Sequence, residues 1–380
     1  MSKFDELLTK LRKTTRIWNL HAIAIIKRYK YWDKLLSLMF NYSSRCYYRK
    51  GPLEVEKLKN PCIDLKYFSD NFGRFSTSKT LIGKVTFDPY DLEISQHLLN
   101  LAYENIKKPR ICELTSLEIL SKVVAYRDLK ENTVIKIATV NDQNKIEFTE
   151  YVVDTIFDLW KTHVAFGLIP KNFPKTNPIL LYRGTDFSFL SESGRASIIS
   201  DLDPDGPGRR LYYNSRSSIR QWLTQMETAG KKARVIGHSL GGVLALYTLL
   251  FEHELLAKES NASSFAFNPP GISEELLDEW SVVQEDSKPP FVTFVTRGDI
   301  VSKFGNLFGD VYEAFTSKPL SPVLAHEQLV FSQPISYIVK IDSDKENFTN
   351  SRKYYSRIQK QTTSIAFRFG LKYLFPNPHR

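Results

Sequence analysis

Hydrophobic residues recur along the middle of the chain with two different spacings. Spacings of three and four are typical of helices with one buried face, and short runs of β-branched or aromatic residues are typical of buried strands. In chain order, these patterns predict helices over 91–106 and 116–126, a strand over 178–182, a helix over 215–226, a strand over 263–268, a helix over 273–280 and a strand over 291–296. Strands that alternate with helices indicate an α/β fold with a mainly parallel sheet and flanking helices.

Other segments have weaker patterns. Residues 133–140 and 145–153 are rich in β-branched residues and are separated by a polar turn, which predicts a β-hairpin. Residues 160–169 fit a helix or a strand equally well. Residues 1–50 predict amphipathic helices that mix Trp, Leu and Ile with Lys and Arg, and residues 51–84, interrupted by Pro and Gly, predict a connector.

The strongest motif lies in the stretch K-K-A-R-V-I-G-H-S-L-G-G-V-L-A-L-Y-T-L-L-F over residues 231–251. An apolar run ends at Gly237, Ser239 stands in the middle of G-x-S-x-G, and a helical pattern follows at once. A strand that turns directly into a helix strains the central residue, and only very small neighbours fit two positions away on either side. A glycine-rich turn that contains a serine by chance is the alternative, but the strand and the helix favour a nucleophile elbow.

Size, cysteine content and charge narrow the class of protein. With 380 residues, of which 42% are hydrophobic, the chain has room for one large α/β domain with additions, or for two smaller domains. Its three cysteines are too few and too scattered for a disulfide framework or a C-x-x-C metal site. The apolar window over 17–26 is too short to span a bilayer and is a poor signal-peptide core, because a basic cluster follows it.

Positive charge is concentrated at the two ends. Residues 1–50 carry twelve Lys or Arg against three acids, and residues 351–380 carry seven against none, whereas the whole chain has a net charge of +10. The body between them is therefore mildly acidic. Basic, aromatic-rich ends indicate either an anionic partner, such as a membrane surface, or simply solvated faces and tails. We see no nucleic-acid recognition motif and expect no nucleic-acid partner.

A nucleophilic serine needs a base to take its proton and an acid to orient that base. In elbow-type hydrolases the chain order is Ser, then Asp or Glu, then His. Three histidines follow Ser239: His253 precedes every plausible acid, and His379 lies in the basic tail. His326 is therefore the predicted base.

Several acids lie between the serine and His326. Asp299 directly follows the strand over 291–296, so it would lie at the carboxyl edge of the sheet, where ligands bind in open α/β folds. Glu285, Asp286 and Asp310 compete, but no clear strand delivers any of them. Asp299 is the predicted acid.

The strand over 178–182 runs into Arg183 and Gly184. A glycine at the end of a strand allows the backbone to turn its N–H groups outward, as an oxyanion hole requires. This turn belongs to a set of motifs that resembles the class 3 lipase group of α/β-hydrolases between about residues 178 and 331. The motifs are L-L-Y-R-G-T (180–185), G-H-S-L-G-G (237–242), D-I-V (299–301) and H-x-x-x-V-F (326–331). The resemblance implies that Ser239 is the nucleophile, Asp299 the acid and His326 the base. It also implies that the backbone N–H groups of Thr185 and Leu240 form the oxyanion hole.

Two departures from the family pattern affect the expected lid and substrate pocket rather than the chemistry. Ile300 stands where the family commonly has proline, and G-R-R-L-Y-Y over 208–213 replaces a His-containing stretch. The acidic run Asp201, Asp203 and Asp205 imitates the start of a calcium loop. The twelfth position is a tyrosine, which excludes an EF-hand and leaves a looser calcium site as the minor alternative. We expect no metal ion and no cofactor.

The sequence therefore predicts a basic, mostly helical N-terminal extension (1–84), an α/β-hydrolase, lipase-like domain (85–345) and a basic C-terminal tail (346–380). The expected activity is cleavage of lipid or other acyl esters through a Ser-His-Asp triad and an acyl-enzyme, with a cytoplasmic or peripheral membrane location. An acyltransferase or thioesterase with the same triad, and a non-catalytic membrane-binding scaffold, are the alternatives.

Overall fold

The computed structural model describes residues 90–184, 206–299 and 301–341, with gaps at 106–108, 128, 142, 161–162, 260, 317–319, 321–324, 327–328 and 332–334. The described part falls within the predicted hydrolase domain. The N-terminal extension, the C-terminal tail and the acidic run over 201–205 lie outside the described residues, so the predicted domain boundaries stay predictions.

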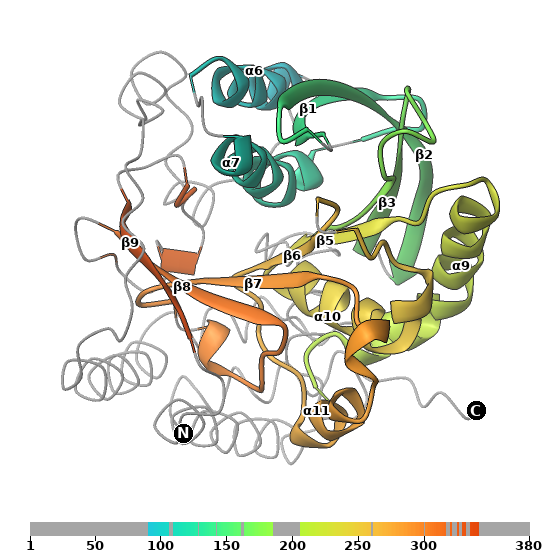
Figure 1. Ribbon diagram of the computed structural model, residues 1–380, viewed down its shortest axis with the longest axis vertical. Helices are drawn as coiled ribbons and strands as arrows, with labels where there is room; N and C mark the ends of the chain where they lie inside the picture. The colour runs from blue at the N-terminus through green and yellow to red at the C-terminus, as the bar shows by residue number, and fades with distance from the viewer. Residues whose placement is uncertain are drawn as a thin grey trace, which may run out of the picture.

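Within the described residues, nine strands form one sheet in which the strands follow their chain order (Figure 1). They are β1 (Val134–Val140), β2 (Ile146–Trp160), β3 (His163–Pro170), β4 (Ile179–Tyr182), β5 (Arg234–His238), β6 (Ser264–Phe267), β7 (Phe291–Thr296), β8 (Asp310–Thr316) and β9 (Ile335–Lys340). The five strands from β4 to β8 pair in parallel. This parallel centre agrees with the predicted fold class.

The edges of the sheet are antiparallel. β1, β2 and β3 form a meander that ends on β4, and β9 pairs antiparallel with β8. The predicted hairpin is confirmed as β1 and β2, and the ambiguous segment over 160–169 is largely strand β3. The sequence patterns did not predict β8 and β9. Short connections permit antiparallel neighbours, whereas each parallel pair needs a crossover.

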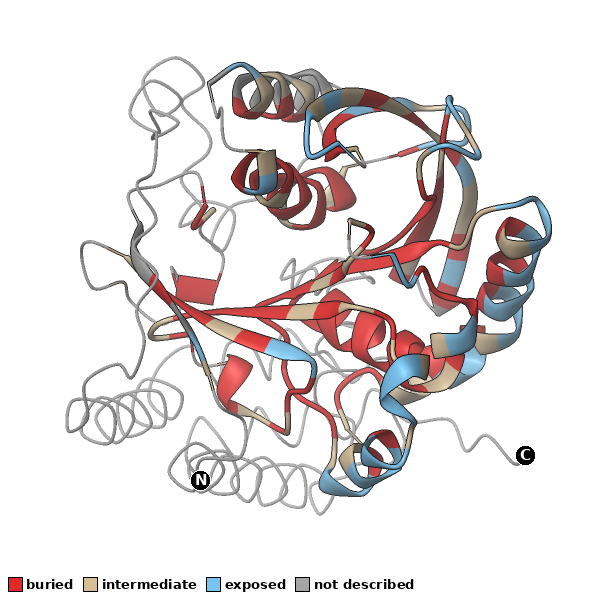
Figure 2. Cartoon of the chain, in the orientation of Figure 1, coloured by how far each residue is buried: buried red, intermediate tan, exposed pale blue. Residues whose placement is uncertain are grey.

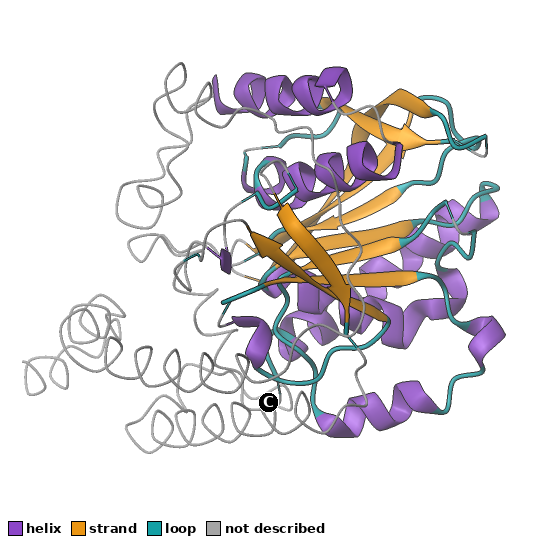
Figure 3. Ribbon diagram, turned by 60° about the vertical axis from the view of Figure 1, so that its left-hand side comes forward, coloured by secondary structure: helices purple, strands orange, loops and turns teal. Residues whose placement is uncertain are grey.

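Helices cover both faces of the sheet (Figure 3). The major helices of the described residues are α6 (Tyr90–Asn105), α7 (Pro109–Lys122), α9 (Arg209–Thr228), α10 (Leu240–Glu252) and α11 (Glu274–Ser281). α6 and α7 lie on one face, and α9, α10 and α11 lie on the other (Figures 1 and 3). α9, α10 and α11 supply the crossovers from β4 to β5, from β5 to β6 and from β6 to β7.

Each face of the sheet has its own apolar core. α7 and α10 are the most deeply buried helices on their respective faces, as the red ribbons in Figure 2 show. α7 begins well before the predicted helix over 116–126, and the last predicted turn is a short 3-10 helix, Val124–Tyr126. The first half of α7 contains polar residues that are nevertheless buried, among them Glu113 and Thr115. These residues interrupt the apolar spacing on which the prediction was based. None of the described helices is long and apolar enough to cross a membrane.

The parallel centre decides where functional residues can meet. β5, β6 and β7 all end at the same edge of the sheet, since they run in the same direction. Ser239, Asn268 and Asp299 follow these three strands closely. Residues that are far apart in the chain therefore lie along one edge.

We predict that Gly167→Ala destabilises the fold. Trp222 is buried, and its indole N–H donates to Asp154 over 2.9 Å. A Cβ at position 167 would lie 2.7 Å from the Trp222 ring, so the indole must shift. We expect a loss of about 1–3 kcal/mol in the free energy of unfolding, measured by urea denaturation.

The control for Gly167→Ala is Thr224→Ala, on the exposed face of α9, where a surface substitution should change stability by less than about 0.5 kcal/mol. An unfolding midpoint of Gly167→Ala equal to that of the control would contradict the packing argument.

Candidate active site

The turn between β5 and α10 has the geometry of a strained elbow. Ser239 has φ 56° and ψ −126°, a conformation that is rare for a residue with a side chain. A Cβ at Gly237 would lie 2.1 Å from the carbonyl oxygen of Gly241, and a Cβ at Gly241 would lie 2.6 Å from the carbonyl oxygen of Tyr182. Only glycine fits at both positions, which is the reason that the sequence argument gives for them.

The structure brings the three predicted catalytic side chains into one hydrogen-bonded line. Nε2 of His326 lies 2.8 Å from Oγ of Ser239, and its Nδ1 lies 3.1 Å from Oδ1 of Asp299. All three residues are buried, with Ser239 and His326 each 3% exposed. The Asp299 carboxylate can only accept a hydrogen bond, so Nδ1 of His326 carries the proton that it donates. In the neutral imidazole Nε2 is then unprotonated and can accept a hydrogen bond from the hydroxyl of Ser239.

His326 reaches this edge because of the sheet topology. β8 runs parallel to β7 and β9 returns antiparallel beside it, so the connection between β8 and β9 starts and ends at the carboxyl edge. Ala325 and His326 lie in that connection. The predicted base therefore comes from the C-terminal part of the described residues, in the chain order that elbow-type hydrolases have.

Asp299 is fixed by donors on several sides. The backbone N–H of Val301 donates to Oδ1 over 2.9 Å, Nδ2 of Asn268 donates to Oδ2 over 2.9 Å, and the hydroxyl of Ser302 also donates to Oδ2. Complete burial by itself would raise the pKa of Asp299. The nearby His326 and the hydrogen bonds from His326, Ser302 and Asn268 outweigh burial, so the net pKa of this carboxyl is lowered. Asp299 thus remains a carboxylate that orients the imidazole.

Comparison with known proteins agrees with this geometry. Residues 160–308 match the family model described as lipase (class 3). Over these residues the chain is class 3 lipase-like, and its mainly parallel sheet with flanking helices is that of an α/β-hydrolase. The match includes Ser239 and Asp299 and ends before His326.

Among solved structures, the native Rhizomucor miehei lipase propeptide complex is similar to this lipase-like hydrolase with 18% sequence identity and a TM-score of 0.34. The alignment covers 53% of this chain and 65% of that chain, which is less than two thirds of the length of the Rhizomucor protein. A search of the curated proteins found no match.

The competing residues lie elsewhere in this lipase-like domain. Asp310 starts β8 and therefore lies at the opposite edge of the sheet from Asp299. Glu285 and Asp286 belong to a short 3-10 helix, where Glu285 pairs with Lys288. His253 follows α10 and contacts Trp280 rather than the elbow. His379 lies outside the described residues.

Of the two predicted oxyanion donors, Leu240 lies among the described residues and Thr185 does not. Leu240 is the first residue of α10, and the first N–H groups of a helix have no partner within the helix. Thr185 lies outside the described residues, but the preceding Gly184 lies against the elbow. A Cβ at Gly184 would be 2.5 Å from the carbonyl oxygen of His238 and 2.2 Å from the hydroxyl of Tyr126.

Sequence reasoning missed several residues that surround the three predicted side chains. Asn268 holds Asp299 and also donates to the carbonyl oxygen of Ala325 over 3.0 Å. Its position as the last residue of the predicted strand over 263–268 is a signal that could have identified it. His238 donates from Nε2 to the carbonyl oxygen of His326 over 2.9 Å, since a carbonyl can only accept. No local pattern predicts that contact.

His238 makes the stability of this lipase-like domain depend on pH. Burial lowers the pKa of His238 well below its ordinary value; the nearby His326 and Lys122 lower it further, and the hydrogen bond to the carbonyl of His326 opposes them. Below about pH 6.5 the unfolded chain binds a proton at His238 that the folded protein does not bind. The free energy of unfolding therefore decreases as the pH is lowered. From this group we expect a progressive loss of stability as the pH is lowered from about 6.5 towards the lowered pKa of His238.

The test is His238→Gln, because a glutamine amide can still donate to the carbonyl of His326 but does not titrate. Urea denaturation at about pH 7.5 and about pH 5.5 measures both proteins, and the other groups contribute equally to each. The variant should lose less stability on acidification than the wild type. Identical pH dependence in the two proteins would show that His238 does not carry the effect.

Proposed function

We propose that the protein is a serine ester hydrolase that acts on lipid or another acyl ester. The observation that supports this best is the line of hydrogen bonds from Asp299 through His326 to Ser239, which stands on a strained strand-to-helix turn. In that arrangement a base contacts the nucleophile and an acid orients the base.

The proposed reaction has two halves. Oγ of Ser239 attacks the ester carbonyl carbon while Nε2 of His326 takes the hydroxyl proton, and Asp299 stabilises the imidazolium that forms. The tetrahedral oxyanion accepts hydrogen bonds from the backbone N–H groups of Leu240 and Thr185. The intermediate collapses, His326 protonates the departing alcohol, and an acyl group remains on Ser239. Water, deprotonated by His326, then releases the acid and restores the serine.

The choice of substrate rests on charge. The basic segments over 1–50 and 351–380 would hold the enzyme against anionic phospholipid. This favours phospholipase or lysophospholipase activity over triglyceride hydrolysis. An acyltransferase or thioesterase would use the same three side chains with another acceptor or leaving group, and a non-catalytic membrane scaffold would use the basic ends alone.

We predict that a fluorophosphonate probe labels the wild type at Ser239. Ser239→Ala should not label at all, and His326→Ala should lose about a million-fold in rate, because no base then takes the serine proton. Asp299→Asn should lose roughly 10⁴-fold, since the amide favours the wrong imidazole tautomer. Mass spectrometry of the labelled peptide locates the adduct. Wild-type protein that is folded but never labels would exclude the proposed hydrolase.

A second prediction concerns the membrane. The wild type should sediment with vesicles that contain phosphatidylserine and should remain in solution with purely phosphatidylcholine vesicles. The difference should disappear at about 1 M salt, where the screening length falls to about 3 Å. Equal binding to both kinds of vesicle would argue against recognition of anionic lipid. Sedimentation without fluorophosphonate labelling would favour the scaffold.

A further inference from the structure

The connection between β8 and β9 carries His326 and must hold it within hydrogen-bond distance of two partners. Connections usually run over the surface, because a buried one must satisfy its own backbone polar groups. Here the residues near His326 are buried: Ala325 is 0% exposed, Val330 1% and Phe331 2%. Their backbone groups therefore need partners inside the protein.

The backbone N–H groups of Val330 and Phe331 have their partner in Glu118 on α7. Its Oε1 accepts the backbone N–H of Val330 over 2.8 Å, and its Oε2 accepts that of Phe331 over 2.9 Å. Nζ of Lys122, one turn further along α7, lies 2.9 Å from Oε1 of Glu118. Both side chains are only 1% exposed. A carboxylate is an acceptor on both oxygens, so one buried ion can fix two consecutive N–H groups, and charge-assisted bonds of this kind are the strong ones.

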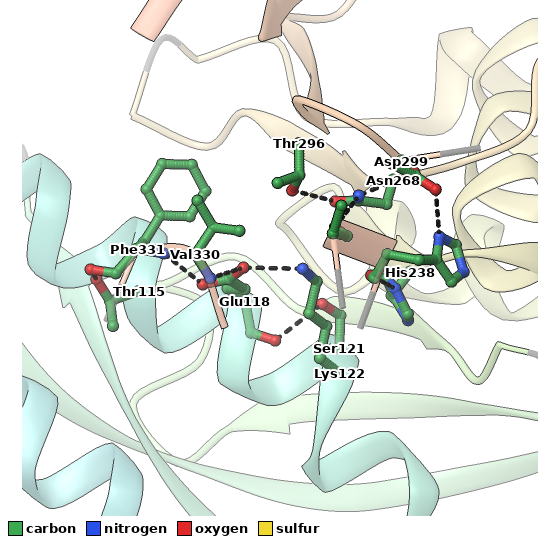
Figure 4. A network of polar contacts seen from close by, with 12 residues as sticks. Thr115, Glu118, Ser121, Lys122, His238, Asn268, Thr296, Asp299, Val330 and Phe331 are labelled. Atoms are coloured by element: carbon green, nitrogen blue, oxygen red, sulfur yellow. Dashed lines mark hydrogen bonds and ion pairs between the residues drawn. The ribbon is translucent and has the colours of Figure 1, made fainter. Parts of the chain in front are cut away.

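Other contacts hold the same connection nearer to the base. Nδ2 of Asn268 donates to the carbonyl of Ala325, and Nε2 of His238 donates to the carbonyl of His326. On the far side, the ring of Phe331 packs edge-on against Phe294 with centroids 4.9 Å apart. Figure 4 shows Glu118 and Lys122 beside Val330 and Phe331, with His238, Asn268 and Asp299 in the same network. The predicted base is thus held from both sides. On the C-terminal side Glu118 accepts two backbone N–H groups, and the hydroxyl of Thr115, also on α7, donates to the carbonyl oxygen of Phe331 over 3.4 Å.

We propose that Glu118 is a positioning residue for His326: the carboxylate on α7 grips the backbone of Val330 and Phe331 and so sets the place of the imidazole relative to Ser239. This inference rests on the proposed function. It makes α7, which precedes the residues matched by the lipase family model, part of the catalytic apparatus.

The test is Glu118→Gln, which keeps the shape of the side chain. One oxygen becomes an NH₂ group that faces a donor, so one of the two backbone N–H groups loses its acceptor. Hydrogen exchange measured by mass spectrometry should show faster exchange in the peptide over 325–331, by about tenfold or more, as expected for loss of a hydrogen bond to a charged group. The maximal rate of fluorophosphonate labelling at Ser239 should fall about a hundredfold, because a displacement of about 1 Å has effects of that size. The probe concentration at half-maximal rate should not change.

Glu113→Gln is the matched control. Glu113 lies on the same helix, is almost as deeply buried, and pairs with Arg234 over 2.8 Å at the start of β5, far along the strand from the elbow. Glu113→Gln should lower the melting temperature, because it removes one partner of a buried ion pair. It should keep the labelling rate at Ser239 and the hydrogen exchange of the 325–331 peptide within about twofold of the wild type, since it leaves the connection between β8 and β9 untouched. Where Glu118→Gln does not fold, Glu118→Asp keeps the charge and withdraws it by one methylene, and the same pattern is expected.

Three outcomes would overturn the inference: unchanged exchange in the Glu118 variants, faster exchange with unchanged labelling, or equal losses in the Glu118 and Glu113 variants. A wild type that does not label contradicts the proposed function instead. The exchange comparison then decides by itself whether Glu118 holds the connection.

Discussion

The contact between the end of β5 and the start of α10 is the constraint on which the site depends. A methyl group at Gly237 would overlap the backbone of Gly241, and one at Gly241 would overlap the backbone of Tyr182 at the end of β4. Ser239 lies between the two glycines in a backbone conformation that costs about 1–3 kcal/mol and that persists only where the surroundings enforce it. The surroundings here are β4 and β6 on either side of β5, and the almost fully buried α10 behind it.

Buried polar groups, each with a partner, hold the rest of the site. Asn268 bonds to Asp299, Thr296 and Ala325, and so connects the predicted acid, the strand β7 and the segment that carries the predicted base. In a low-dielectric interior such a network is rigid when every member is satisfied, and a lost partner is costly. Its value lies in the geometry that it imposes more than in the stability that it adds.

The same reasoning applies to the buried ion pairs of α7. A buried pair gains little over an apolar replacement, because desolvation offsets the attraction, but removal of one partner is strongly destabilising. Glu113 ties α7 to β5, and Glu118 ties it to the connection between β8 and β9. Only Glu118 contacts the segment that carries the predicted base, whereas Glu113 contacts β5 at the end far from the elbow. The proposed catalytic unit therefore extends on both sides of residues 160–308, which match the lipase family model.

Local features could be predicted from the sequence. The elbow, its glycines, the hairpin and the strands that precede Ser239 and Asp299 each depend on residues a few positions apart, where steric limits and hydrophobic spacing act directly. Chain order was enough to select His326, and the strand that precedes Asp299 selected it among the competing acids. The structure places Asp299 and Ser239 within hydrogen-bond distance of His326. Other features depend on pairing between distant parts of the chain, and only the tertiary structure decided them. They are the strands β8 and β9, the pairing of β3 with β2 and β4, and the contacts of Asn268, His238 and Glu118. Glu118 binds residues more than 200 positions away, and within its helix it is only an acid in an apolar run, so no local pattern could reveal its partner.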